Sequence, residues 1–264
     1  MTRALTLEEL DRDLYRSPAD VLWTPPAGRS VFGGQIAAAA LRAATLSLDD
    51  AHAGFSISSL HSYFLLGGDH NRPIVYRVTR LRDGRSFSTR SVTATQGGQA
   101  IFAAEVQFHR EEGTPDSLEH QVDFPAGVPP PESLPSMQEN LKAYLADPRL
   151  RKEMVPFVTK YIQAPFPMDI RPLSPVDPFG PVPVPSARQL VWMRCTEALG
   201  PAETGKRVGA ESFLHTAAIT YASDWSLAST MMLPHGLAYG AVASPYAVAG
   251  EGGGVGQRPP AQPS

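Results

Sequence analysis

The chain has 264 residues, 42% of them hydrophobic and 19% charged, which is enough for one large domain or two small ones with real cores. Its formal net charge of -3 leaves no basic excess for a nucleic-acid backbone or an anionic membrane. The single cysteine, Cys195, excludes an internal disulfide and a thiolate metal cluster and is typical of an intracellular protein. We therefore expect no nucleic-acid partner, no metal and no cofactor.

The first ten residues carry acidic side chains, Glu8 and Glu9, where a secretory signal needs an apolar core, so no cleavable export signal is expected. Residues 35–46 then predict a helix in which Gln35 and Arg42 interrupt an almost continuous apolar surface. Such a helix has to be surrounded by protein. Gly33-Gly34 before it indicate a tight turn, with backbone N–H groups that bind an anion or a developing oxyanion as the alternative.

Four strands are predicted next, over residues 55–66, 74–82, 86–95 and 100–109. Asp83-Gly84 indicate a two-residue hairpin between the second and the third. The last strand has one apolar face, formed by Phe102, Ala104, Val106 and Phe108. The economical architecture is α+β, an antiparallel sheet wrapped around a central apolar helix, which is the hotdog arrangement.

Proline concentrates in the middle of the chain, where 16 of the 26 prolines fall between residues 112 and 187. Because proline removes a backbone donor, we expect no regular sheet here, only a connector with one helix over residues 136–150, broken at Asp147-Pro148. The predicted domains are an N-terminal hotdog (1–111), this linker (112–187), a shorter C-terminal hotdog (188–240) and a disordered Gly/Pro-rich tail (241–264).

The C-terminal unit begins with a predicted strand over residues 189–196 and continues with an apolar stretch, residues 213–233, in which Asp224 is the only formally charged residue. An ionised carboxylate in apolar surroundings costs several kcal/mol unless it is paired or hydrogen-bonded. Asp224 is therefore a candidate catalytic residue that orients or deprotonates a water. The alternative is that it caps a helical segment that begins at Trp225. The many polar groups of the stretch argue against a membrane span.

Two further residues with reactive side chains have structural interpretations. His61 lies in a predicted strand, where an exposed or hydrogen-bonded histidine is commoner than a base. Cys195 is interpreted as a packed small side chain, since no histidine is near it in sequence. The sequence has no serine-hydrolase elbow, phosphate-binding loop or HExxH zinc motif.

Several spaced motifs resemble those of the acyl-CoA thioesterase II family, over roughly residues 10–239. They are Phe32-Gly33-Gly34-Gln35, Leu60-His61-Ser62-Tyr63-Phe64, Leu81-Arg82-Asp83-Gly84-Arg85-Ser86, Gln189-Leu190-Val191-Trp192-Met193-Arg194 and Tyr221-Ala222-Ser223-Asp224. The resemblance implies a double hotdog that hydrolyses fatty acyl-CoA to free acid and CoA without a covalent intermediate. It also implies that Asp224 is catalytic.

The resemblance ends after Gly240, where the sequence has neither the Asp-His-Ser-x-Trp-Phe-His nor the Gln-Glu-Gly motif that carries the family's Thr or Ser and Gln partners of the aspartate. We therefore expect a C-terminally truncated chain with an incomplete second hotdog. Apolar residues of its helix become candidates for exposure: Phe213, Leu214, Ile219, Tyr221, Leu227 and Met231.

Three functions follow from these patterns. The first is a thioesterase acting on fatty acyl-CoA, with no membrane span, forming a homo-oligomer through hotdog sheet edges. The second is a catalytically impaired acyl-CoA-binding or dimerisation subunit that pairs with a full-length thioesterase, and the third, ranked last, is a dehydratase-type hotdog. Asp147-Pro148-Arg149-Leu150 resembles the eukaryotic peroxisomal branch, but the C-terminus has no peroxisomal tripeptide, so the peroxisomal matrix and the cytoplasm both remain open.

Overall fold

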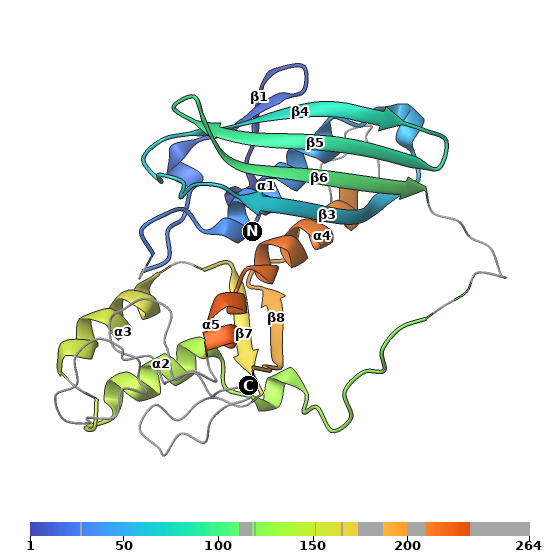
Figure 1. Cartoon of the computed structure of the whole chain (residues 1–264). Coiled ribbons are helices and arrows are strands. Elements are labelled where there is room, and N and C mark those ends of the chain that lie inside the picture. Colours follow the sequence, from blue (N-terminus) through green and yellow to red (C-terminus); the bar gives the residue numbers. More distant parts are fainter. Residues whose placement is uncertain are drawn as a thin grey trace, which may run out of the picture.

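The computed structural model describes residues 1–26, 28–110, 118, 120–150, 152–164, 166–173, 187–199 and 210–232 (Figure 1). The predicted tail, residues 241–264, lies outside these residues. Most of the N-terminal unit is one six-stranded antiparallel sheet with strand order β1-β2-β4-β5-β6-β3. The strands are β1 (Glu8–Asp11), β2 (Leu14–Ser17), β3 (Phe55–Phe64), β4 (Ile74–Asp83), β5 (Phe87–Gln96) and β6 (Gln99–Arg110).

The four strands predicted from residue 55 onward are confirmed, with ends shifted by one or two residues. The predicted two-residue hairpin is wrong, because Asp83 pairs with Ser88 and four residues lie between them. The Gly84 N–H donates to the Phe87 carbonyl across this longer turn. β1 and β2 were not predicted, since they are short and carry no clear alternation of apolar residues.

Helix α1 (Gly33–Leu46) lies against the concave side of the sheet, as the apolar composition predicts. Ala38 and Leu41 are completely buried, as are Phe102 and Val106 on the inward face of β6. Burial stabilises each large apolar side chain by about 1.5–3 kcal/mol, and small alanines let the sheet approach the helix closely. The α+β hotdog prediction is therefore confirmed for this unit.

The connector holds more structure than predicted. Helix α2 (Met137–Ala146) is confirmed, and it begins with a capping box in which Ser136 and Glu139 exchange hydrogen bonds. Helix α3 (Val155–Gln163) was not predicted. Strand β7 (Met168–Pro172) pairs antiparallel with β8 (Val191–Cys195), so the expectation that the proline-rich linker contains no sheet is wrong. Proline is tolerated there because Pro172 stands at the strand end.

The C-terminal unit contributes α4 (Ala210–Ser223) and α5 (Leu227–Met232). α4 packs against α1 and reaches β3 (Figure 1). The predicted exposure of its apolar residues is partly confirmed: Ile219, Leu227 and Met231 are each more than 60% exposed. For Tyr221 the expectation is wrong, because this side chain is completely buried against α1.

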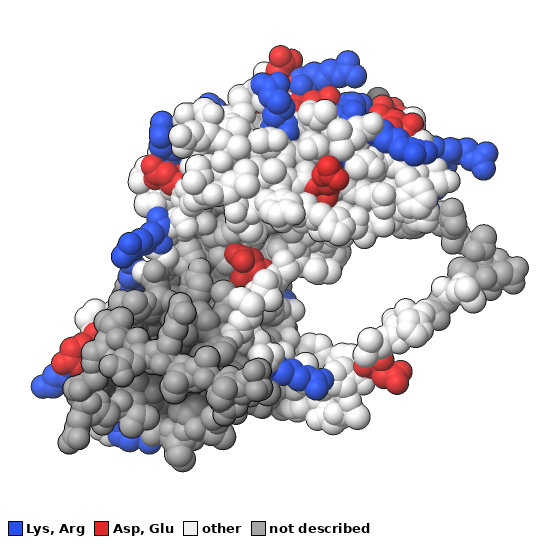
Figure 2. Space-filling view, in the orientation of Figure 1, with Lys and Arg blue, Asp and Glu red and all other residues white. Residues whose placement is uncertain are grey.

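Charged side chains lie mainly around the rim of the molecule in the view of Figure 2, with basic and acidic atoms beside one another along the upper edge of the sheet. Ion pairs such as Asp13–Arg80 account for part of this pattern. The middle of the same face is largely uncharged. Within the described residues, none of the helices has the length and apolar character that crossing a bilayer requires.

Candidate active site

The N-terminus of α1 meets the C-terminus of α4 at Asp224. The Gly34 N–H donates a hydrogen bond of 3.0 Å to Asp224 Oδ2, joining residues 190 positions apart. Phe32, the residue that caps α1 in sequence, has no side-chain acceptor. The carboxylate of α4 therefore satisfies an amide that α1 cannot satisfy itself, at the positive end of the helix dipole.

Of the two hypotheses for Asp224, capping of its own following helix is wrong. α5 begins at Leu227, and Ser226, with a φ of 62°, separates the two segments. The carboxylate faces α1 instead, so it caps a helix of the other unit. This arrangement leaves the catalytic hypothesis open, since carboxylates that bridge two units of a fold are well placed to face a substrate between them.

The glycine pair that begins α1 is required by the close approach of α4. A Cβ at Gly34 would lie 2.2 Å from the Tyr221 carbonyl oxygen, and a Cβ at Gly33 would lie 2.8 Å from Asp224 Oδ2 and from the Phe64 ring. Real Cβ atoms do not come this close to backbone, so any side chain here would push α4 away. The tight-turn interpretation is wrong, because both glycines are helical residues of α1. The anion-binding alternative has a counterpart within the chain, since the Gly34 N–H binds the protein's own carboxylate.

Burial raises the pKa of Asp224 above its ordinary value, and hydrogen bonds from the Gly34 and Gly33 amides offset only part of that rise. Among the described residues, no lysine, arginine or histidine forms an ion pair with this half-buried carboxylate. A carboxylate without a cationic partner in an apolar environment is a stronger base than a solvated one. A raised pKa is one property that a carboxylate needs to act as a general base.

Five aromatic rings surround the segment that carries Asp224, and we call them the aromatic cluster. They are Trp23, Phe32, Phe166, Tyr221 and Trp225, from the segment before α1, the connector and the α4–α5 junction. Phe32 and Tyr221 are buried, with ring centroids 5.1 Å apart. The cluster thus packs around the residues on both sides of Asp224 in sequence.

A largely apolar groove of about 690 Å³ lies between α4 and the β7–β8 strands. Its lining includes Ala222, Ser223 and Trp225, the neighbours of Asp224 in sequence. The apolar lining includes Met168 and Met193 from the strands, Leu199 from the segment after β8, and Ile219 from α4. Arg194, Glu197 and His215 also line the groove, whereas Asp224 itself does not, because its carboxylate points to α1.

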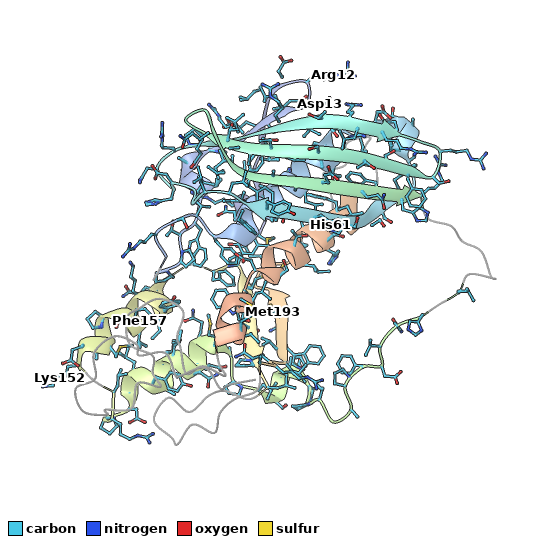
Figure 3. All side chains as sticks on the ribbon, viewed as in Figure 1. Arg12, Asp13, His61, Lys152, Phe157 and Met193 are labelled. Carbon is cyan, nitrogen blue, oxygen red and sulfur yellow. The ribbon has the colours of Figure 1, made fainter. Side chains whose placement is uncertain are left out.

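The other sequence candidates have structural roles or face away from Asp224. Gln35 is buried and ties the N-terminal segment to α1, because it accepts from the Trp23 N–H and donates to the Ala4 and Val21 carbonyls. His61 is exposed on β3, where it pairs with Glu105 across the strands (Figure 3). Cys195 is half-buried on β8, and burial raises the pKa of its thiol, in keeping with a packed side chain.

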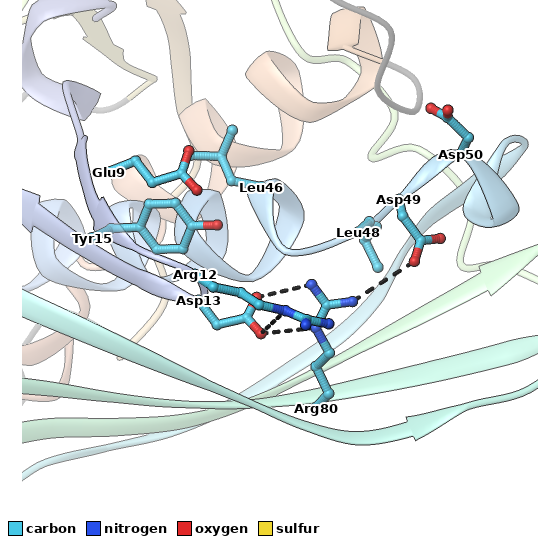
Figure 4. Close-up of a pocket in the computed structure, with 9 residues that line it drawn as sticks. All are labelled: Glu9, Arg12, Asp13, Tyr15, Leu46, Leu48, Asp49, Asp50 and Arg80. Carbon is cyan, nitrogen blue, oxygen red and sulfur yellow. Dashed lines mark hydrogen bonds and ion pairs between the residues drawn. The ribbon is translucent and has the colours of Figure 1, made fainter.

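A second pocket, of about 350 Å³, lies at the opposite end of α1 (Figure 4). Part of its charge is paired within the protein, since Arg80 donates two hydrogen bonds of 2.9 and 3.0 Å to Asp13 and lies 3.7 Å from Asp49. These contacts join β4 to the turn before β2. Within the described chain no group of three or more histidine, cysteine or acidic residues is arranged to hold a metal ion.

The family profile of the acyl-CoA thioesterase N-terminal domain matches residues 21–109, which span α1 and most of the sheet. Human acyl-coenzyme A thioesterase 8 is 34% identical over 236 residues, covering 89% of this chain and 68% of the human protein. The chain belongs to the acyl-CoA thioesterase II family. It is thus a thioester hydrolase by family, as the spaced motifs predicted.

Other members of the family agree with this assignment. The peroxisomal acyl-coenzyme A thioester hydrolase 1 of Saccharomyces cerevisiae is 36% identical over 102 residues, or 38% of this chain and 28% of the yeast protein. The crystal structure of the acyl-CoA thioesterase II TesB2 from Mycobacterium marinum superposes with a TM-score of 0.59 at 30% identity, covering 89% of this chain and 70% of that chain. The fold resemblance therefore extends beyond the N-terminal hotdog.

Proposed function

We propose that this thioesterase hydrolyses fatty acyl-CoA by an attack of water for which Asp224 is the general base. The single observation that carries the proposal is the half-buried Asp224 carboxylate on the Gly34 amide, with a pKa raised by burial. The residues on both sides of it in sequence line an apolar groove, which supports the proposal. The water oxygen bonds to the thioester carbonyl carbon while its proton passes to Asp224. Collapse of the tetrahedral intermediate breaks the carbon–sulfur bond, and the proton leaves with the CoA thiol.

The substrate's acyl chain fits the groove between α4 and the β7–β8 strands, because that surface is apolar and adjoins the residues on both sides of Asp224. The positive end of the α1 dipole lies at the same point and favours developing negative charge. This placement assigns the reaction to the junction of the two units. The metabolic setting that we propose is fatty-acid metabolism.

The test compares free-thiol release from a long-chain acyl-CoA by the native chain and by Asp224→Asn, with a protein-only blank for Cys195. Loss of the base is expected to lower kcat by about 10²–10⁴-fold. Because the pKa of Asp224 is raised, the rate of the native chain should fall as the pH drops through that pKa, at a higher pH than an ordinary carboxylate would give. Asp50→Asn, on an exposed carboxylate at the other end of α1, is the matched control.

Each outcome of this test has one meaning. Equal hydrolysis by the native chain and by Asp224→Asn would contradict the role of Asp224. If neither hydrolyses while both bind acyl-CoA, the acyl-CoA-binding subunit becomes the better assignment. A native rate that exceeds the variant's at least a hundredfold supports the general base.

We also propose that β3 mediates homo-oligomerisation. It forms one edge of the sheet, and among the described residues its outer side pairs with no strand. The strand carries no Lys, Arg, Asp or Glu, and the side chains at its end, Tyr63 and Phe64, are 76% and 54% exposed. Ser58→Lys places a charge on this edge and should reduce the sedimenting mass to that of a monomer; an unchanged mass would place the interface elsewhere.

For the compartment we propose the peroxisome, because the yeast relative is a peroxisomal thioester hydrolase by name. Co-localisation of the fluorescently tagged chain with a peroxisomal marker tests this. A diffuse cytoplasmic signal would contradict it.

A further inference from the structure

Phe166 contacts the rings of all four other members of the aromatic cluster, as Phe32 does. Its centroid lies 4.5 Å from Trp225, 5.1 Å from Trp23, 5.8 Å from Tyr221 and 5.9 Å from Phe32. It belongs neither to α1 nor to α4, since it lies in the connector two residues before β7. A connector side chain therefore contacts the segment that precedes α1 and the junction that follows α4.

The contacts of Phe166 lie on both sides of Asp224. Trp225 follows the carboxylate directly, and the Trp225 N–H donates to the Ala222 carbonyl in the turn that ends α4. Tyr221 lies one helical turn earlier, where its carbonyl oxygen approaches Gly34. A side chain that packs on both residues limits the movement of the turn between them.

We propose that Phe166 is a positioning residue that holds the α4–α5 junction against α1 and thereby keeps the Asp224 carboxylate on the Gly34 amide. The effect on hydrolysis rests on the proposed function of Asp224, whereas the effect on the carboxylate's position does not. The cluster also excludes water from this side of the carboxylate. The connector thus forms part of the site instead of only joining two units.

The first test measures the carboxylate directly and needs no activity. In the native chain, the side-chain carbon of Asp224, assigned in a ¹³C NMR titration by its disappearance in Asp224→Asn, should titrate above the ordinary aspartate pKa of 3.8. In Phe166→Ala, this pKa should fall toward 3.8 as water enters. Phe166→Leu keeps most of the apolar volume and should give an intermediate value, which covers the case in which the alanine variant fails to fold.

Hydrogen exchange of the Gly34 amide gives a second readout. The Ile36 N–H, which donates to the Phe32 carbonyl, is the internal reference for α1. In Phe166→Ala the Gly34 amide should exchange about tenfold faster relative to Ile36, because its acceptor has moved. A merely structural loss of stability would accelerate both amides together.

Two matched variants control for general effects. Phe157→Ala removes another half-buried connector phenylalanine, on α3 away from α1, where it packs on Tyr161 (Figure 3). Tyr221→Phe keeps the ring and removes a buried hydroxyl that has no hydrogen-bond partner among the described residues. Both should leave the Asp224 pKa and the Gly34 exchange ratio unchanged.

Hydrolysis separates this proposal from the proposed function. In Phe166→Ala, kcat should fall about tenfold with KM changed less than about twofold, and the acid limb of the rate profile should move to lower pH. A native-like Asp224 pKa and Gly34 exchange ratio in Phe166→Ala and Phe166→Leu would overturn the positioning role. If both readouts change while Asp224→Asn hydrolyses normally, the positioning role stands and the catalytic role of Asp224 falls.

Discussion

The two ends of α1 carry carboxylates in opposite electrostatic environments. At the N-terminus, Asp224 lies on the Gly34 amide without an ion-pair partner in the described chain, and burial raises its pKa. At the C-terminus, burial opposes but does not outweigh the hydrogen bond and charge of Arg90, which hold the pKa of Asp83 below its usual value. The pKa of Asp83 is thus lowered because the buried Arg90 lies beside it, whereas burial raises the pKa of Asp224, beside which the described chain places no cation.

The C-terminal end is a network that connects α1 to the sheet. Arg90 is completely buried, donates to Ser47 Oγ after the last turn of α1, and lies 2.6 Å from Asp83. His52 bridges the same carboxylate to Asp49, at 3.0 and 2.7 Å. Cations at a helix C-terminus also complement the dipole. Asp83 therefore belongs to a stabilising ion-pair network, whereas Asp224 is the carboxylate to which we assign the proposed chemistry.

The largest expected change in stability comes from removing the buried cation. Arg90→Met should lower the free energy of unfolding by about 3–5 kcal/mol, because Asp83 loses its partner and the Arg82 and Thr89 carbonyls lose their donor. Urea denaturation measures this. The double variant with Asp83→Asn should recover part of the loss, and purely additive effects would show that the pair does not interact.

At the N-terminal end of α1, Gly34→Ala should lower the free energy of unfolding by about 2–3 kcal/mol, because the added methyl group overpacks the contact with α4. Replacing glycine with alanine normally stabilises a helix by about 1 kcal/mol. A loss of stability in Gly34→Ala would therefore be due to the Tyr221 carbonyl oxygen, which would lie 2.2 Å from the new Cβ. Gly68→Ala is the control, because its Cβ would meet Ile36 and Val31 at an ordinary 3.4 Å. Equal thermal stability of both variants would mean that α4 does not approach α1 as described.

A smaller expected effect is the pH-dependent change in stability caused by Asp224→Asn, and its sign distinguishes the two ends of α1. Since the folded-state pKa of Asp224 is raised, ionisation destabilises the folded state as the pH rises through that pKa. Asp224→Asn should then be more stable than the native chain at pH 7, by less than about 1 kcal/mol for this half-exposed group, with no difference below pH 3.8. Thermal denaturation at both pH values measures this.

Asp83→Asn should change the stability in the opposite direction, making the protein less stable than the native chain at pH 7. Its lowered folded-state pKa gives stability that is present above the unfolded pKa and lost as the pH falls through the folded value. Its partial exposure limits the effect to about 1 kcal/mol. Parallel responses of Asp224→Asn and Asp83→Asn to pH would contradict the comparison between the two ends.

The sequence predicted the parts of this site that depend on local patterns. Hydrophobic periodicity identified α1 and four strands, and a lone charge in an apolar stretch identified Asp224. The partner of Asp224 was not predictable, because Gly34 lies 190 residues away and binds through its backbone. Phe166 was missed for the same reason, since its contacts come from dispersed segments.

For the Arg90–Asp83 network at the C-terminal end of α1, the sequence does contain a signal. Arg90 occupies an inward position of β5, in phase with the buried Ser88, Val92 and Ala94. A charged residue in the apolar phase of a strand needs a buried partner, which the structure supplies in Asp83. The alternation of inward and outward residues along β5 therefore identifies Arg90 as a buried cation, although it does not identify Asp83 as its partner.

The hydrogen bond between Gly34 and Asp224 also has a consequence for the order of events during synthesis. The segment that forms α1 leaves the ribosome 190 residues before the carboxylate that caps it, a delay of about 10–40 s at ordinary elongation rates. The nascent N-terminal hotdog can bury its helix during this interval, but the amide at its start awaits the end of α4. The hydrolysis that we propose at this junction therefore has to wait until translation has passed Asp224.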